Sequence, residues 1–224
     1  MKKSFILSAL LLTTVFVVNA KADTVMEPEG VHPCAKQSAS MCDANEEPFT
    51  GTVTEKVNGV LRGTSVFKDG QQNGVVKTFY PNGKVETEAN FKAGKQDGIA
   101  KSYWDNGNLK AEITFVNGKQ NGAIKAYRKD GSLMAEGTQK EGVPQGAQKT
   151  YYKNGKVVYE TNFKDGKKDG KYRKYYSNGQ VETEGNYSND MPDGVVKTFD
   201  RNGKLLEEVT YNKGERVIKN EEKK

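Results

Sequence analysis

The sequence predicts an all-β protein, an elongated antiparallel meander of stacked β-hairpin repeats with a 24-residue period. One glycine series starts at Gly74 and a second at Gly83, and each recurs every 24 residues through six copies. A third series starts at Gly70 and is interrupted once, at Asp190. Self-similarity at a fixed period marks a repeat array, in which each repeat buries its apolar face against its neighbours.

Each repeat is predicted to contain one hairpin followed by a second turn. Two short runs rich in β-branched and aromatic residues flank Asn82-Gly83, and Asn-Gly between such runs is a strong hairpin signal. The connection at 92–98 is polar and glycine-rich, so it turns the chain back again. A degenerate copy of the hairpin surrounds Asn58-Gly59. Three glycines per repeat, each unfavourable by about 1 kcal/mol in a helix interior, exclude helix.

The strand register follows from where the apolar residues recur. Position 79 and its equivalents are aromatic, and position 85 and its equivalents are aliphatic. A three-residue loop, Pro81-Asn82-Gly83, would pair 79 with 85 and place 79, 85 and 91 on one face. A two-residue loop would instead set Lys77 opposite Glu88. We expect the first register because it gathers the apolar positions, and it puts Lys77 and Glu88 on different faces.

The chain is predicted to have four segments. Residues 1–22 form a signal peptide cleaved after Ala22, since a charged start and an apolar run precede a small-x-small site. The apolar run is shorter than the roughly 20 residues that span a bilayer, which disfavours a retained anchor. Residues 23–48 are expected to be a flexible leader, 49–214 one degenerate plus six full repeats, and 215–224 a polar tail that caps the edge strand. The protein is therefore expected in the periplasm or outside the cell.

Cys34 and Cys42 are candidates for a disulfide, because they lie close together in a chain expected in an oxidising compartment. His32 stands beside Cys34, and a metal site can be considered there. No fourth convincing ligand accompanies it, so we predict neither a metal nor a cofactor.

Composition argues against several functions. Loss of residues 1–22 removes three lysines and no acid, which lowers the net charge from +6 to +3. The remaining charges are interspersed, whereas nucleic-acid binding usually shows a one-sided basic patch. An enzyme needs a converging constellation of acid, base, nucleophile or metal. Here lysine and glutamate recur in rows, so we predict a non-catalytic protein that does not bind nucleic acid.

Position 80 is the candidate binding row, because Tyr, Trp and Arg dominate binding hot spots. It holds Tyr80, Trp104, Arg128, Tyr152 and Tyr176, beside the turns and expected on the face opposite the aromatic core row. The alternative is that these rings only shield strand edges or pair across strands. Their partner is expected to be a protein. An envelope glycan that stacks on the rings is the second possibility, and an anionic membrane surface is disfavoured by the low net charge.

The repeats resemble the MORN-variant repeats of bacterial YwqK-like proteins. The resemblance rests on Tyr-Tyr-x-Asn-Gly-Lys, as at 151–156, and on Glu-x-x-Phe-x-x-Gly-Lys-x-x-Gly, as at 160–170. It covers roughly residues 50–214. It implies an antiparallel sheet of stacked hairpins with a binding or scaffolding role. It also implies, as a further alternative, an antitoxin that neutralises a toxin partner.

Overall fold

The computed structural model describes residues 24–35 and 40–218. The predicted signal peptide and the end of the polar tail lie outside these residues. The described chain divides into two compact units. Residues up to Gly122, together with Lys129–Gly131, form the first unit, and Ala123–Arg128 with Ser132 onward form the second.

The described residues contain strands and no helix. The first unit holds eleven complete strands, which are β1 (Thr24–Glu27), β2 (His32–Pro33), β3 (Met41–Cys42), β4 (Gly51–Val57), β5 (Val60–Lys68), β6 (Gln71–Gln72), β7 (Gly74–Phe79), β8 (Val85–Lys92), β9 (Lys95–Gln96), β10 (Gly98–Tyr103) and β11 (Leu109–Val116). The strand β12 (Lys119–Tyr127) begins in the first unit and ends in the second.

The second unit continues the alternation of long strands and turns. Its complete strands are β13 (Leu133–Lys140), β14 (Val143–Tyr151), β15 (Val157–Lys164), β16 (Lys167–Tyr175), β17 (Val181–Ser188), β18 (Met191–Pro192), β19 (Gly194–Phe199), β20 (Leu205–Asn212) and β21 (Glu215–Arg216).

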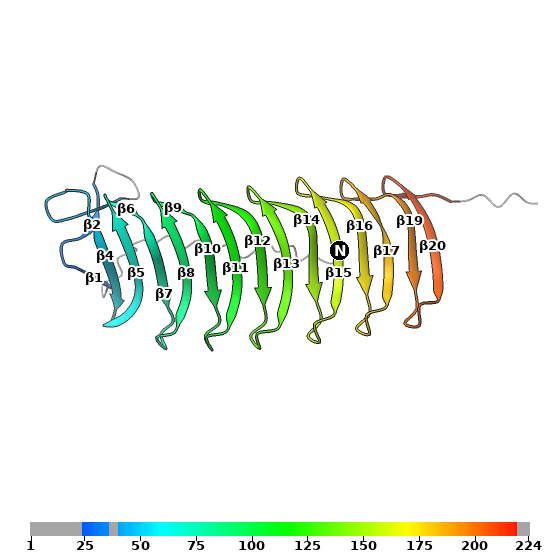
Figure 1. The fold of residues 1–224 in the computed structure, drawn as a ribbon, viewed down its shortest axis with the longest axis horizontal. Helices are drawn as coiled ribbons and strands as arrows, with labels where there is room; N and C mark the ends of the chain where they lie inside the picture. Colours follow the sequence, from blue (N-terminus) through cyan, green and yellow to red (C-terminus); the bar gives the residue numbers. More distant parts are fainter. Residues whose placement is uncertain (1–23, 36–39, 219–224) are drawn as a thin grey trace, which may run out of the picture. The chain divides into compact units, whose positions relative to one another are not determined.

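Strands that follow each other along the chain are antiparallel neighbours within each unit. In the first unit β4, β5, β7, β8, β10 and β11 pair in that order. In the second unit the order is β13, β14, β15, β16, β17, β19 and β20, as Figure 1 shows. The prediction of an all-β antiparallel meander of hairpin repeats is confirmed.

Two kinds of turn alternate along the meander. At the first, the Tyr80 N–H donates to the Lys84 carbonyl oxygen at 2.9 Å, and Gly83 has a φ of 79°. This is the predicted three-residue loop 81–83 with glycine in the left-handed region. At the second, Ala93 and Gly94 both have positive φ, 46° and 73°, and form a two-residue loop between paired Lys92 and Lys95. Positive φ at both central residues is typical of a type I′ hairpin.

The register of each hairpin corrects one prediction. Phe79 pairs with Val85, as expected, but the register shifts by one residue between Thr78 and Phe79. Beyond this bulge Lys77 lies opposite Glu88, and Gly74 lies opposite Phe91. Because side chains alternate along β7, Phe79 shares the face of Lys77 and lies opposite the face of Phe91. The expectation that 79, 85 and 91 share one face, with Lys77 and Glu88 on different faces, is wrong.

The bulge separates apolar from charged side chains. Without the shift, Val76 would lie opposite Glu88. With it, Val76 lies opposite Ala89 and Lys77 opposite Glu88. Val76 and Ala89 are each only 1% exposed, so the shifted register keeps carboxylates out of the buried rows. We call the side with Val76, Ala89 and Phe91 and their equivalents the core face, and the side with Lys77 and Glu88 and their equivalents the charged face.

On the core face, a large side chain is matched by a small one across each hairpin. Val76 faces Ala89, and Ala100 faces Ile113. Tyr172 faces Gly185, where an added Cβ would lie 2.9 Å from the Tyr172 ring. Rings then follow one another across strands, with the centroids of Tyr172 and Tyr187 at 4.5 Å. The residues differ between these pairs, but in each pair one large and one small side chain fill the space together, as close packing requires.

Gln139 occupies the core-face position that holds Phe163 in the same unit. Its side chain is 3% exposed, and its Oε1 has no hydrogen-bond partner among the described residues. A buried polar atom without a partner is unfavourable by about 1–3 kcal/mol. The repeat that contains Gln139 is therefore expected to be a weak point of the second unit.

We expect Gln139→Met to stabilise the second unit by about 1–3 kcal/mol. The substitution keeps the side-chain length and removes the unpaired amide. Urea unfolding followed by tyrosine fluorescence measures the change. Phe163→Gln is the reciprocal control and should destabilise the protein, whereas a lower urea midpoint for Gln139→Met would contradict this explanation.

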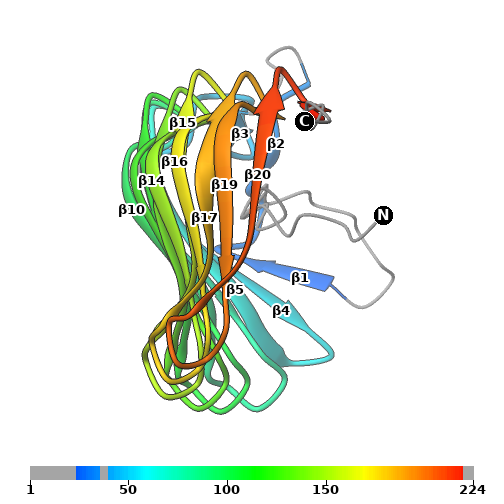
Figure 2. The ribbon, with the colours of Figure 1, turned by 90° about the vertical axis from the view of Figure 1, so that its right-hand side faces the viewer.

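The segment expected to be a flexible leader differs from that expectation. β1 pairs with β4, and β2 pairs with β3. Figure 2 shows β1 and β4 at the start of the sheet, with the strands bending along their length. Val31 and Met41 pack with Val53 and Phe67 in a buried cluster. The segment therefore covers the start of the first unit with apolar side chains.

The C-terminal end of the second unit is less covered. β21 pairs with Tyr211 and Asn212 of β20, and the Val217 N–H donates to the Thr210 carbonyl oxygen, so within the described residues the tail covers the last part of this edge strand. Leu205 and Leu206 are 47% and 61% exposed.

Candidate functional site

The charged face carries opposite charges in alternation across successive strands. In the first unit Glu88 lies opposite Lys77 in its own hairpin and opposite Lys101 in the next. Across the second unit the same alternation continues in β13 to β20. Nitrogen–oxygen distances within hairpins are 3.1 Å for Lys77–Glu88, 3.9 Å for Lys101–Glu112, 3.5 Å for Lys149–Glu160, 3.1 Å for Arg173–Glu184 and 3.6 Å for Lys197–Glu208. These side chains are partly exposed, so each pair stabilises by only about 0–1 kcal/mol.

Aromatic residues at position 79 and its equivalents border this charged row. The Tyr151 hydroxyl donates a hydrogen bond to Glu136 Oε1, which places the ring on the charged face. Burial, followed by this bond and the charges of Glu136 and Glu160, raises the pKa of Tyr151 to about 12. The charged face thus joins a charge row to half-buried rings along each unit.

Burial also raises the pKa of Tyr172 to about 12 and raises that of Tyr159. Both tyrosines lie on the core face, where their ring centroids are 6.2 Å apart. A phenol held in its neutral form by burial binds its proton more tightly in the folded chain than in the unfolded chain, where its pKa is about 10.

We therefore expect the protein to lose stability as the pH rises from about 10 to about 12. The contribution of a raised phenol pKa is complete below the unfolded pKa and disappears on approach to the folded pKa. Urea midpoints measured across this range, with phenolate absorbance followed in parallel, check it. Tyr151→Phe and Tyr172→Phe should each flatten the decline, and an unchanged decline in both variants would contradict the assignment.

The candidate binding row at position 80 holds neighbouring repeats together. The Tyr80 hydroxyl donates to the Tyr103 carbonyl oxygen at 2.7 Å, 23 residues further along the chain. Tyr152 and Tyr176 make the equivalent bonds, at 2.8 and 2.9 Å. In the second unit, Arg128 donates to the Tyr151 carbonyl oxygen and to that of Leu133. In the first, the Lys110 ammonium lies over the Trp104 ring at 4.8 Å. Tyr80, Arg128, Tyr152 and Tyr176 thus have a structural contact through their polar ends, and the role of the row in binding stays a prediction.

The turn asparagines have a second role that the sequence reasoning missed. Asn82 Oδ1 accepts from the Lys84 N–H, and its Nδ2 donates to the Asp105 carbonyl oxygen in the next turn. Asn154 and Asn178 repeat both contacts in the second unit. The available signal was the recurrence of asparagine before the turn glycine in every full repeat except the one with Asp130.

Cys34 and Cys42 are joined by a disulfide. His32 lies in β2, with its Nε2 3.7 Å from Glu46 Oε1. In the described part of the chain, no three His, Cys, Asp or Glu side chains gather as a metal site would require. Among those same residues, no helix is long and apolar enough to cross a membrane.

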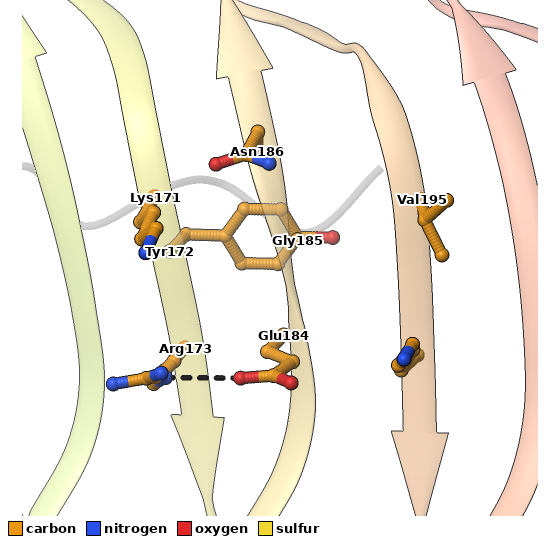
Figure 3. A pocket seen from close by; sticks show the side chains of 8 residues that line it. Lys171, Tyr172, Arg173, Glu184, Gly185, Asn186 and Val195 are labelled. Carbon is orange, nitrogen blue, oxygen red and sulfur yellow. Dashed lines mark hydrogen bonds and ion pairs between the residues drawn. The ribbon is translucent and has the colours of Figure 1, made fainter.

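One hollow of about 210 Å³ opens on the second unit beside the charged row. Figure 3 shows Arg173 bonded to Glu184, with Lys171, Asn186 and Val195 around the opening and the Tyr172 ring lying across Gly185. Lys197 completes the rim. Arg173, Glu184 and Lys197 continue the alternating charge row, and Lys171 adds one further cation beside it.

Comparison with known proteins agrees with the repeat architecture. The family model described as MORN repeat variant matches residues 72–93, 96–117, 144–165, 168–189 and 192–213. The repeat that contains Gln139 falls between the second and third of these matches. No curated protein matches the sequence.

Two solved structures are similar to part of the chain. One is a mutant of S. aureus TarM in complex with fondaparinux, alpha-GlcNAc-glycerol and UDP, at 16% identity and a TM-score of 0.30, covering 43% of this chain and 19% of TarM. The other is a GtfA/B complex, at 16% identity and a TM-score of 0.20, covering 46% of this chain and 18% of that one. The alignments span under a fifth of either neighbour, and at these scores they carry no argument about activity.

The repeating hairpins define a β-repeat protein. Within this class the chain belongs to the MORN repeat variant family, whose repeats are generally non-catalytic modules for protein interaction.

Proposed function

We propose that this chain is an exported, non-catalytic repeat protein that binds a protein partner through its charged face. The observation that carries the proposal is the arrangement of Lys77, Glu88 and Phe79, which recurs along each unit. Catalysis needs different groups converging on one point. A row of equivalent positions instead offers a broad surface on which many small contacts add up.

The composition of this face suits protein recognition. Half-buried rings beside paired charges provide apolar area together with polar groups that fix orientation. Because each charge already has a neighbour of opposite sign, the exposed pairs contribute specificity more than affinity. The rings of position 79 are then the expected source of binding energy.

Binding can be tested by pull-down with the full chain from extracts of its host. Tyr103→Ser and Tyr175→Ser alter the charged face of the first and second unit, respectively. Trp104→Ala and Tyr152→Ala alter the candidate row at position 80. We expect the serine variants to lose a partner that the wild-type chain retains. Equal recovery with all four variants would contradict binding through either surface.

Export is supported by the pattern of residues 1–22 and by the disulfide, since disulfides persist in oxidising compartments. Mass spectrometry of the protein from its host is expected to find an amino terminus at Asp23. A mature chain that still begins at Met1 would contradict export through a cleaved signal.

The antitoxin function and glycan binding are finer alternatives. Toxin neutralisation rests on the family resemblance alone and would require a captured partner whose toxicity the chain suppresses. Glycan binding would require a sugar ligand on an array that is lost on Trp104→Ala. In the structure Tyr80, Tyr152 and Tyr176 direct their hydroxyls to backbone carbonyls, which favours protein binding through the charged face.

A further inference from the structure

Strand β16 departs from the repeat pattern on the charged face. Position 171 is lysine, where the equivalent residues include Val75, Ile99 and Val195. Position 173 is arginine, where every other repeat has lysine. The other full repeats have valine, isoleucine or alanine at the position equivalent to Lys171. Packing of the repeat therefore does not require a cation at position 171.

Both exceptions border the hollow described above. Arg173 Nε donates to Glu184 Oε2 at 3.1 Å, and Lys197 lies 3.6 Å from Glu208 on its far side. A guanidinium has five N–H donors, so the bond to Glu184 leaves Arg173 capacity for a second acceptor. The Lys171 ammonium has neither a hydrogen bond nor an ion pair among the described residues.

Asn186 adds a neutral donor to the same rim. In the equivalent position one repeat earlier, Asn162 donates from Nδ2 to the Lys171 carbonyl oxygen at 2.9 Å. The Asn186 side chain has no such partner within the described residues. Val195 provides an apolar wall beside these donors.

We propose that the hollow binds a carboxylate of an acidic segment in the protein partner, an inference that rests on the proposed function. Lys171 and Arg173 supply the charge, and Asn186 supplies a directed donor. Arginine forks match carboxylate geometry, and such charge-assisted bonds are among the stronger polar contacts. Val195 fits the methylene stem of a glutamate. Arg173 is paired with Glu184 and Lys197 with Glu208, so the excess charge is the one of Lys171, which suits a single carboxylate better than a polyanion.

The binding test uses end-capped triglutamate as the probe and end-capped triglutamine as its neutral match. We expect triglutamate to cause saturable amide NMR shifts at Gly185 and at the Asn186 side chain, with none from triglutamine. Lys171→Val restores the residue found at Val75 and Val195, so the fold should persist. This variant is expected to weaken triglutamate binding at least fivefold.

Lys164→Val is the matched control, because it removes the same charge from the same unit outside the hollow. It should leave triglutamate binding unchanged. Equal loss in both lysine variants, or shifts of the same size with triglutamine, would overturn the carboxylate site. Tighter binding of inorganic phosphate than of triglutamate would also overturn it and would assign the site to a phosphoryl group.

Failure here can be separated from failure of the proposed function. Suppose that the Lys171→Val variant still captures the partner while the Tyr103→Ser and Tyr175→Ser variants do not. The charged face would then bind protein, but the hollow would not bind a carboxylate of that partner.

Discussion

Ile113→Ala is expected to lower the free energy of unfolding of the first unit by about 2–5 kcal/mol. Ile113 is 1% exposed and lies opposite Ala100 on the core face, so no large side chain across the hairpin can fill the space left behind. The loss combines the transfer of the removed methyl groups with a cavity that closes only in part. Urea unfolding followed by the fluorescence of Trp104, in the same unit, measures it.

Ile99→Ala is the matched control on the neighbouring strand. Ile99 alternates to the charged face and is 45% exposed, so the same chemical change should reduce stability by less than about 1 kcal/mol. Equal effects of the two substitutions would mean that the assignment of the two faces is wrong.

Gly185→Val is expected to destabilise the second unit by about 1–3 kcal/mol or more. A Cβ at this position would lie 2.9 Å from Tyr172 Cε1 and 2.9 Å from Val196 Cγ2. The backbone of Gly185 does not have a positive φ, so the effect comes from the lack of space and not from backbone strain. Thermal and urea unfolding of the variant measure the loss.

A double substitution distinguishes lack of space beside Tyr172 from a general sensitivity of β17 to substitution. Tyr172→Val with Gly185→Ala recreates the Val76–Ala89 pair that the first unit uses at the equivalent place. The double variant should be more stable than Gly185→Ala alone. If Tyr172→Val gives no rescue, the complementarity of large and small residues across the hairpin does not explain Gly185.

The period, the strands and the positions of the turns could be predicted from the sequence because they depend on local chemistry. Glycine at 83 and at 94 meets a backbone requirement that other residues meet poorly, so its recurrence marks the turns. The pairing of Phe79 with Val85 follows from the length of the loop between them.

The assignment of faces could not be predicted from the loop length, because one bulged residue reverses every side chain beyond it. The signal for the correct register was the regular recurrence of a basic residue at position 77 and glutamate at position 88. Their opposite charges can pair directly only when the two residues lie opposite each other. The regular aromatic positions favoured the other assignment of faces. Aromatic rings at position 79 are tolerated beside charges because their rims remain partly exposed.

Residues outside the period were also missed. Gly137 and Gly185 belong to none of the recurrent glycine series, and each lies where a Cβ would contact a large side chain, Gln148 or Tyr172. Contacts across a hairpin depend on register, so these glycines become understandable only when the register is known.

The most direct test of the account is the cross-strand pairing of Lys77 with Glu88, on which the charged face and both proposals depend. Directly opposite residues have Cα atoms about 4.5–5.5 Å apart, within the span of a disulfide. Under mild oxidation the variant Lys77→Cys with Glu88→Cys is expected to form a cross-link. Lys77→Cys with Thr87→Cys, whose side chains lie on opposite faces, should stay reduced. Cross-linking of the second pair in preference to the first would contradict the register, the two faces and the binding surface drawn from them.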